Sequence, residues 1–410
     1  MKRIILFAIT TSLLTTGLTS AQEEAAPVFG IKFSGFVKTD IFYDTRQSSE
    51  SLGLREGHFY LYPDNVSLDA DGVDINANGS LHMLSIQTRL KGSITGPDAF
   101  GAKTSGIIEA EFFGTSSGDV NGFRLRHAFV NLDWGKSSLI VGQTWHPMFP
   151  AQSFPGTVSF NTGVPFVPFS RNPQVRFTYK AGDLSLLLTS YAQRDFTSTG
   201  PDGASNKYLR NSTIPTVDFQ VQFVPGGSKH FIMAGVDYKT LRPELKTSKG
   251  YATDATIGSL SAYANVKIYT APVTFKAMAT YGQNATDLMM LGGYAISDTI
   301  DAATGYKEYT NLSVFSTWAE ISTNGTKVQF GLFAGYCKNL GAPVALNGKT
   351  FARGADVDNL WRISPRLNFN SGKFTFGNEI EMTRAAYTTG GVISEHVTNV
   401  RFLVSAIYNF

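Results

Sequence analysis

The C-terminal stretch from Asn399 to Phe410, NVRFLVSAIYNF, decides the fold class. Apolar and polar side chains alternate along it: Val400, Phe402, Val404, Ala406, Tyr408 and Phe410 stand against Asn399, Arg401, Ser405 and Asn409. Successive side chains of a β-strand point to opposite faces, so this alternation predicts a strand with one apolar and one polar face. Its length also suffices to cross a bilayer, since a tilted transmembrane strand needs about 9–11 residues.

The same alternation recurs along the whole chain, which predicts an all-β fold with about sixteen strands. We expect them at 31–44, 80–94, 104–114, 122–134, 137–145, 174–181, 184–192, 216–224, 230–241, 256–270, 272–283, 309–323, 327–338, 358–370, 373–387 and 398–410. No later segment of the sequence has the 18 consecutive apolar residues that a membrane-spanning helix requires.

The connections between these segments alternate in length. Long ones lie at 45–79, 146–173, 193–215, 242–255, 284–308, 339–357 and 388–397, and most of the others are tight, such as Gly135-Lys136 and Gly182-Asp183. Transmembrane β-barrels have short periplasmic turns and long outer loops. We therefore predict a single transmembrane antiparallel β-barrel with both chain ends on the periplasmic side.

Composition narrows the class of protein further. Of 410 residues, 16% are charged and 13% aromatic, there is one cysteine, and the formal net charge is +3. This excludes a disulfide framework, and the charge is too small for a general nucleic-acid binder. Lys2 and Arg3, the apolar run up to Leu18 and the small residues before Gln22 indicate a signal peptide at 1–21. The expected mature domain is then 22–410, with 33 basic against 32 acidic residues.

The connection 146–173 is rich in proline and phenylalanine. Its prolines exclude a regular strand, and long loops in compact structures are usually functional. We expect this third long loop to fold into the lumen and constrict it, with candidate constriction residues Phe149, Phe154, Phe160, Phe166, Phe169 and Arg171. The alternative is an outer loop that packs on a neighbouring subunit or on other loops.

If apolar positions face lipid, the opposite positions line a pore. The candidate lining and selectivity residues are Lys38, Arg89, Lys91, Glu109, Glu111, Arg176, Lys180, Lys276, Arg362, Arg366, Glu379, Glu381 and Arg401. With Lys32, Lys239, Lys267, Asp40, Asp218 and Asp237, the lumen carries twelve basic and seven acidic side chains. Such a surplus favours anions. The alternative is that these charges pair across strands, as Arg362 and Arg366 would with Glu379 and Glu381. Whether Arg124 and Arg126 face the lumen or the lipid is ambiguous, because the alternation of apolar and polar residues in their strand changes parity near His127.

Several stretches resemble one porin family. They are Gly35 to Asp44 (GFVKTDIFYD), Ile108 to Phe113 (IEAEFF), Leu125 to Asn131 (LRHAFVN) and Val141 to Phe149 (VGQTWHPMF). Together they resemble the DcaP-like outer-membrane porins, particularly relatives from Bacteroidota, and Phe410 resembles the terminal aromatic signature of such barrels. The resemblance implies a sixteen-stranded trimeric channel, and some members of the family pass dicarboxylate-like anions. Founding members carry an N-terminal helical extension, for which residues 22–30 leave no room.

Other functions find weaker support in the sequence. We expect no enzyme activity and no cofactor, because no convergent nucleophile and base are visible. Asp69, Asp71 and Asp74 offer oxygen ligands for calcium, but without the EF-hand spacing, so a solvated or loop-stabilising cluster is the default. The hypothesis is a Gram-negative outer-membrane porin for small hydrophilic solutes with an anion preference. The rival is a barrel-anchored adhesin that binds through its outer loops.

Overall fold

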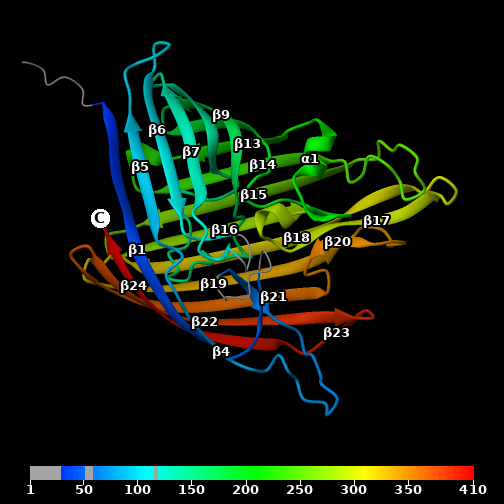
Figure 1. Ribbon diagram of the computed structural model, residues 1–410. Coiled ribbons are helices and arrows are strands. Elements are labelled where there is room, and N and C mark those ends of the chain that lie inside the picture. Colours follow the sequence, from blue (N-terminus) through cyan, green and yellow to red (C-terminus); the bar gives the residue numbers. More distant parts are fainter. Residues whose placement is uncertain (1–28, 51–58, 115–118) are drawn as a thin grey trace, which may run out of the picture.

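The computed structural model describes residues 29–50, 59–114 and 119–410, so the expected signal peptide lies outside the described residues. The chain forms a closed antiparallel barrel of sixteen strands (Figure 1). The wall strands are β1 (Gly30–Asp44), β4 and β5 (Ser80–Leu84 and Arg89–Thr95, one wall strand in two pieces), β6 (Lys103–Glu111), β7 (Arg124–Asp133), β8 (Ser137–Trp145), β9 (Arg171–Ala181), β10 (Leu184–Tyr191), β13 (Thr216–Phe223), β14 (Phe231–Leu241), β15 (Ile257–Tyr269), β16 (Val273–Gln283), β18 (Tyr306–Thr323), β19 (Val328–Gly341), β21 (Val357–Ser371), β22 (Phe374–Thr389) and β24 (Val397–Asn409).

Pairing of the first and last wall strands closes the barrel. β1 pairs antiparallel with β24 from Phe36 opposite Asn409 to Asp44 opposite Arg401. Every other neighbouring pair of wall strands is also antiparallel. Closure matters because lipid cannot hydrogen-bond the backbone groups of an open sheet edge.

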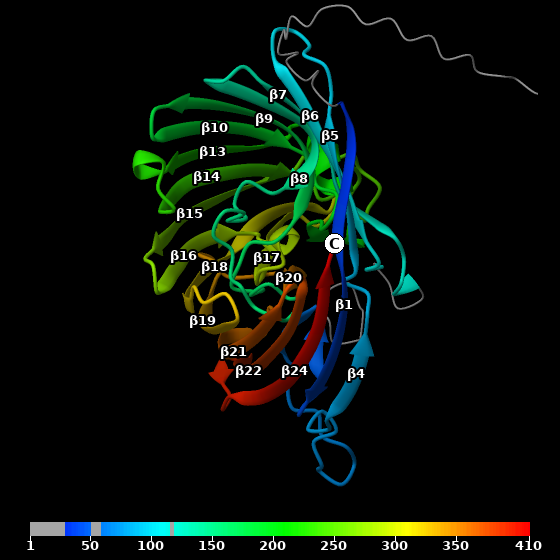
Figure 2. The same cartoon turned by 90° about the vertical axis from the view of Figure 1, so that its left-hand side faces the viewer.

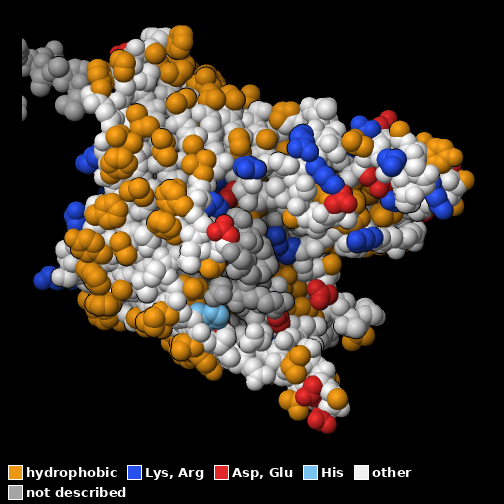
Figure 3. Space-filling model, viewed as in Figure 1, with side chains coloured by type: hydrophobic (Ala, Val, Ile, Leu, Met, Phe, Trp, Pro, Cys, Tyr) orange, Lys and Arg blue, Asp and Glu red, His pale blue; other side chains and the backbone are white. Residues whose placement is uncertain are grey.

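The predicted alternation of faces is confirmed. On β24, Phe402 is 50% exposed and faces outward, whereas the neighbouring Arg401 is 1% exposed and faces inward. Apolar side chains are spread over the left-hand part of the molecule in Figure 3, on the side where the C-terminus lies in Figure 1, and charged side chains are most frequent on the loops at the right. This outer face is what hydrocarbon requires, with the polar positions turned to the lumen.

Short turns and long loops lie at opposite ends of the barrel (Figure 1). Gly182 (φ +64°) and Gly372 (φ +57°) occupy two of the tight turns, where a left-handed backbone favours glycine. The start of β1 lies at the turn end, since Gly35 and Phe410 exchange backbone hydrogen bonds of 3.4 and 3.1 Å. Among the described residues, no helix combines the length and the apolar run needed to cross a membrane.

The structure differs locally from the predicted strands. The predicted strand 80–94 is broken between β4 and β5, and β9 begins at Arg171, so Pro173 lies in a strand. Proline is tolerated there because it lacks only the donor and still offers its carbonyl. The long connections also hold short elements: β2 (Ser48–Glu50), β3 (Tyr60–Pro63), β11 (Thr199–Gly200), β12 (Gly203–Ala204), α1 (Lys207–Ser212), the 3-10 turn η4 (Thr286–Leu288), β17 (Gly292–Asp301), β20 (Thr350–Arg353) and β23 (Val392–Ile393). A further 3-10 turn, η3 (Pro225–Gly227), lies in the short turn between β13 and β14.

The main hydrophobic core lies inside the barrel. It joins loop residues such as Phe59, Phe160 and Met289 to inward-facing wall residues such as Trp318 and Phe333. The outer loops therefore pack into the lumen, and a solute path can follow only the polar gaps that they leave.

Candidate channel constriction

The loop 146–170, between β8 and β9, crosses the lumen. Its backbone carbonyls accept hydrogen bonds from the inward side chains of three wall strands: Gln220 to Pro147 (2.8 Å), Lys267 to Gln152 (2.8 Å) and Lys276 to Phe154 (3.0 Å). The inward fold predicted for this loop is therefore confirmed.

The far wall holds the same loop through charged side chains. The Glu379 carboxylate accepts the backbone N–H groups of Val158 and Ser159, and Glu381 accepts the Asn161 amide at 2.7 Å. Arg362 donates to the Val164 carbonyl at 2.9 Å. Hydrogen bonds to charged groups are stronger than those between neutral groups, so these anchors fix the loop's path.

Five of the predicted lining residues therefore lie in the contact between loop and wall. They are Lys276, Arg362, Arg366, Glu379 and Glu381. Lys276 and Arg366 both pair with Glu320 of β18, at 3.3 and 2.9 Å, and Glu320 also accepts the N–H of Gly156. Glu320 was not among the predicted lining residues, although it lies two positions from the inward-facing Trp318 and so faces the same way.

The loop's phenylalanines divide into two groups. Phe149, Phe160, Phe166 and Phe169 are buried in the core, whereas Phe154 is 44% exposed. All of them except Phe166 border one cavity, which is described below. Arg171 is not part of the loop but begins β9, opposite Trp145. Its guanidinium nonetheless reaches the charged cluster described below.

Gly335 of β19 makes room for one of these rings. A Cβ atom at this position would lie 2.5 Å from the Phe166 ring. Overpacking of this kind costs about 1–3 kcal/mol, so we expect Gly335→Val to displace Phe166 and loosen the loop. Single-channel recording should show a larger and noisier conductance. The matched control is Ala334→Val on the outward face, and equal conductance of the two variants would contradict this packing role.

A β-bulge in β7 settles the ambiguity over its arginines. The register shifts between Glu109 opposite His127 and Ala110 opposite Leu125, so Arg126 is the extra residue. Arg124, Arg126 and His127 can therefore all turn inward. Bulges are common beside functional sites because they re-aim side chains.

Arg124 and Arg126 meet a buried carboxylate, Glu111 of β6. Glu111 lies 2.5 Å from Arg126, 2.9 Å from Arg89 and 3.2 Å from Arg124. Arg171 is 3.6 Å away. Four guanidinium groups thus surround one fully buried carboxylate.

Two further carboxylates complete this group. Glu109 lies 2.8 Å from Arg126, and Asp195, from the loop after β10, lies 2.7 Å from Arg171. We name the seven side chains the arginine cluster: Arg89, Glu109, Glu111, Arg124, Arg126, Arg171 and Asp195. With four positive and three negative side chains, it carries a net charge of +1.

Trp145 of β8 adds an aromatic face to the cluster. Arg126 and Arg171 lie over its rings at 5.5 and 5.2 Å, and Phe149 stacks on it at 3.9 Å. Cation–π contacts of this kind hold the guanidinium planes in place. The cluster is therefore held in position from both the wall and the loop.

The remaining predicted lining residues lie elsewhere on the inner wall. Arg401 pairs with Asp44 at 2.8 Å, and Arg176 donates to the Trp145 carbonyl at 2.8 Å. Lys91 is half-buried on β5, whereas Lys180 is 47% exposed near a turn and lies 3.9 Å from Asp133.

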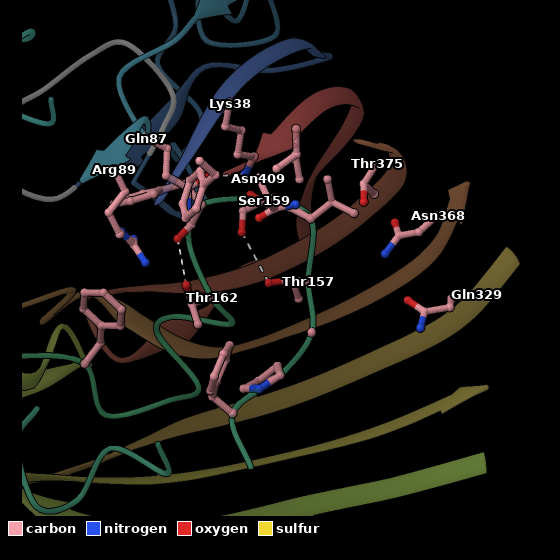
Figure 4. Close-up of a pocket in the computed structure, with 18 of the residues that line it drawn as sticks. Lys38, Gln87, Arg89, Thr157, Ser159, Thr162, Gln329, Asn368, Thr375 and Asn409 are labelled. Atoms are coloured by element: carbon pink, nitrogen blue, oxygen red, sulfur yellow. Dashed lines mark hydrogen bonds between the residues drawn. The ribbon is translucent and has the colours of Figure 1, made fainter. Parts of the chain in front are cut away.

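Two cavities adjoin the arginine cluster. One, of 380 Å³, lies on the side of the turns and is lined by Lys38, Arg89 and Arg126 together with the loop residues 154–160 (Figure 4). The other, of 650 Å³, lies on the side of the outer loops and is lined by Arg124, Arg194, Asp195 and Arg353 among others. Arg124 and Arg126, two residues apart, thus border opposite cavities.

Lys38 joins the wall to the loop at the edge of the first cavity. Its ammonium donates to the Val158 carbonyl at 2.7 Å and to Gln87, and it lies 3.3 Å from Asp40. Figure 4 shows Lys38, Gln87 and Arg89 on one side of this cavity and Gln329, Asn368 and Thr375 on the other.

His146 marks the start of the loop. Its Nδ1 accepts the N–H of Met148 at 3.1 Å, and its Nε2 contacts the Tyr191 hydroxyl at 2.5 Å. Burial lowers the pKa of His146 well below its usual value, and the positive charges of Lys239 and Arg176 add to the shift. The hydrogen bonds at both ring nitrogens hold the start of the loop in place.

The aspartates considered for calcium make hydrogen bonds and an ion pair within their own loop. Asp69 accepts the N–H groups of Asp71 and Val73, and Asp74 pairs with Arg46 at 2.7 Å. Within residues 29–50, 59–114 and 119–410, no three His, Cys, Asp or Glu side chains are grouped as metal ligands.

The comparison with protein families identifies this architecture. The sequence profile of the DcaP outer membrane protein matches residues 14–222, about half of the chain. The chain belongs to the DcaP outer membrane protein family. The resemblance found in the sequence is thereby confirmed, as are the outer-membrane location and the porin assignment. No curated protein sequence matches the chain.

Solved structures share the fold of this DcaP family member. The outer membrane channel DcaP of Acinetobacter baumannii is similar with a TM-score of 0.70 and 17% identity, over 93% of this chain and 97% of that one. The anion-selective porin from Comamonas acidovorans gives 0.54 and 11%, over 93% and 99%. The trimer form of in-vitro folded OmpT from Vibrio cholerae gives 0.52 and 11%, over 93% and 99%. Family and fold are those of channels.

Proposed function

We propose that this porin passes small hydrophilic solutes by passive diffusion and prefers anions. The observation that carries the preference is the lining of the 380 Å³ cavity. Among the residues that the structure describes, its charged lining side chains are Lys38, Arg89 and Arg126, and none is acidic. Positive side chains around a narrow aqueous space attract anions and repel cations.

The proposed path joins the two cavities through the arginine cluster. A solute from the outside would first meet Arg124 and Asp195, then pass the guanidinium groups around Glu111, and leave beside Lys38 and Arg89. A carboxylate or phosphate can move from one guanidinium group to the next because each group offers several hydrogen-bond donors. The net +1 of the cluster keeps the attraction weak enough for release.

The pairing of charges limits this preference. Most of the other basic side chains counted in the lumen have acidic partners or hold the loop, as Arg401 does with Asp44. The twelve-to-seven count therefore overstates the field that a solute experiences, and the net positive charge of the arginine cluster is what the proposed preference depends on.

We further propose a homotrimer in the outer membrane. Its support is the family and the likeness to the trimer form of OmpT. The adhesin alternative gains no support from the loops, because loop 146–170 and residues 59–61 pack inside the barrel.

Planar bilayers test the channel and its preference together. In a potassium chloride gradient, we expect a reversal potential with the sign of chloride permeation. A potassium-selective result would overturn the anion preference. If the protein shows no conductance and liposomes containing it do not swell in small sugars, the channel function itself is overturned and the adhesin is favoured.

A further inference from the structure

The 380 Å³ cavity is bounded by the lumen loop and by two parts of the wall. Figure 2 shows the loop after β8 inside the lumen, between β16 and β19 on one side and β1 and β24 on the other. Loop residues 154–160 form one boundary of the cavity, residues of β1 and β5 a second, and residues of β19, β21 and β22 a third. The volume suits a small organic solute, since ligand pockets measure about 300–1,000 Å³.

The basic side of this cavity has unused hydrogen-bond donors. Arg89 directs its Nε and Nη2 toward Glu109 and Glu111, at 3.6 and 2.9 Å. Arg126 directs its Nε and Nη1 toward the same two carboxylates, at 2.8 and 2.5 Å. Within the described part of the chain, Nη1 of Arg89 and Nη2 of Arg126 have no hydrogen-bond acceptor. Guanidinium donors match the geometry of a carboxylate, so this side of the cavity can bind one.

The opposite side of the cavity is neutral and polar. Gln329 of β19, Asn368 of β21 and Thr375 of β22 point into the cavity (Figure 4). Two oxygen atoms that border it, Asn368 Oδ1 and Ser159 Oγ, are buried without a hydrogen-bond partner among the described residues. Burial of a polar atom is unfavourable unless a hydrogen bond satisfies it, so these oxygens require a donor from water or from a solute.

The two sides together define the chemistry of a fitting solute. It carries one anionic group for the guanidinium donors and several hydroxyl groups for the neutral side, because a hydroxyl group both donates and accepts. An apolar anion would leave the Asn368 and Ser159 oxygens without a donor, and a neutral sugar would leave the guanidinium donors without a charged acceptor. Phe154, which is 44% exposed, adds an apolar surface for the C–H groups of a sugar ring.

We propose that the 380 Å³ cavity is a binding site for sugar acids. The carboxylate binds at Arg89 and Arg126. The ring hydroxyl groups bind at Gln329, Asn368 and Ser159, where they replace water. The inference rests on the proposed anion preference and names the class of solute that the channel binds on its way through. Chloride passes the same cavity without using the neutral side.

Block of the chloride current in planar bilayers tests the class of solute. The probe is glucuronate, and two compounds of the same ring size each lack one of its features: cyclohexanecarboxylate has no hydroxyl groups, and glucose has no charge. We expect glucuronate to halve the current at a concentration about tenfold lower than either compound, the effect of one or two net hydrogen bonds. No block by glucuronate, or equal block by glucuronate and either compound, would overturn the proposal.

Removal of the neutral hydrogen-bonding groups tests the residues. In the double variant Gln329→Leu and Asn368→Leu, the concentration of glucuronate that halves the current should rise about tenfold, because the hydroxyl groups lose their partners. The matched control is Asn359→Leu, on β21 but outside the cavity, which should be blocked as the unmodified protein is. An unchanged block in the double variant, or an equal loss in both variants, would contradict the site.

The same recordings separate this site from the channel function. A chloride-selective conductance that glucuronate does not block contradicts the sugar-acid site and leaves the anion channel standing. Absence of conductance, or a preference for potassium, contradicts the proposed function before any probe is added.

Discussion

Shortening the lumen loop should give the largest change in conductance. In a variant that replaces residues 153–158 by two glycines, we expect single-channel conductance to rise on the order of twofold or more, since constrictions set the flow through porin-type channels. The segment carries Phe154, Pro155 and Val158, which border the 380 Å³ cavity. Its removal also breaks the hydrogen bond from the Val158 N–H to Glu379, whereas the one from the Ser159 N–H is kept.

The fold should survive this deletion because the strongest packing of the loop lies outside it. Phe149, Phe160, Phe166 and Phe169 stay in place and keep the core. The control replaces residues 343–348, an exposed segment of equal length between β19 and β20, by two glycines and should conduct as the unmodified protein does. An unchanged conductance in the 153–158 variant would remove the constriction role, and an equal rise in both variants would point to general loosening.

The barrel could be predicted from the sequence because the same alternation, apolar residues toward lipid and polar residues toward water, repeats at every strand. Val217, Phe219 and Val221 or Phe402 and Val404 can face only outward once the barrel is closed. The inward loop was predictable for a similar reason, since its phenylalanines need a dry environment and its prolines forbid a strand.

The arrangement of charges was not predictable because it depends on register. One extra residue, Arg126, turns two arginines toward Glu111, and no pattern in 122–134 specifies where the ladder shifts. Asp195 approaches from a separate loop. The break between β4 and β5 has the same origin, because residues 85–88 lie inside what reads as one continuous strand.

Neutralising Glu111 should raise the chloride preference. Glu111→Gln changes the arginine cluster from four positive and three negative side chains to four and two, so its net charge rises from +1 to +2. Two unit charges ~8 Å apart in water interact by ~0.5 kcal/mol, which favours chloride and disfavours potassium by a factor of about 2.3 each. The permeability ratio should then rise about fivefold, measured as a shift of the reversal potential.

Arg126→Gln is the matched variant, because it removes the opposite charge from the shortest ion pair of the same cluster. The cluster becomes neutral, and the chloride preference should fall by a similar factor. Both variants leave a buried partner uncompensated, which costs ~3–5 kcal/mol, so both should lower the denaturant concentration at the unfolding midpoint. Trp145, which lies against Arg126, gives a fluorescence signal for that measurement. Equal loss of stability with opposite shifts in selectivity separates the electrostatic role from a structural one, whereas shifts in the same direction would show that solutes bypass the cluster.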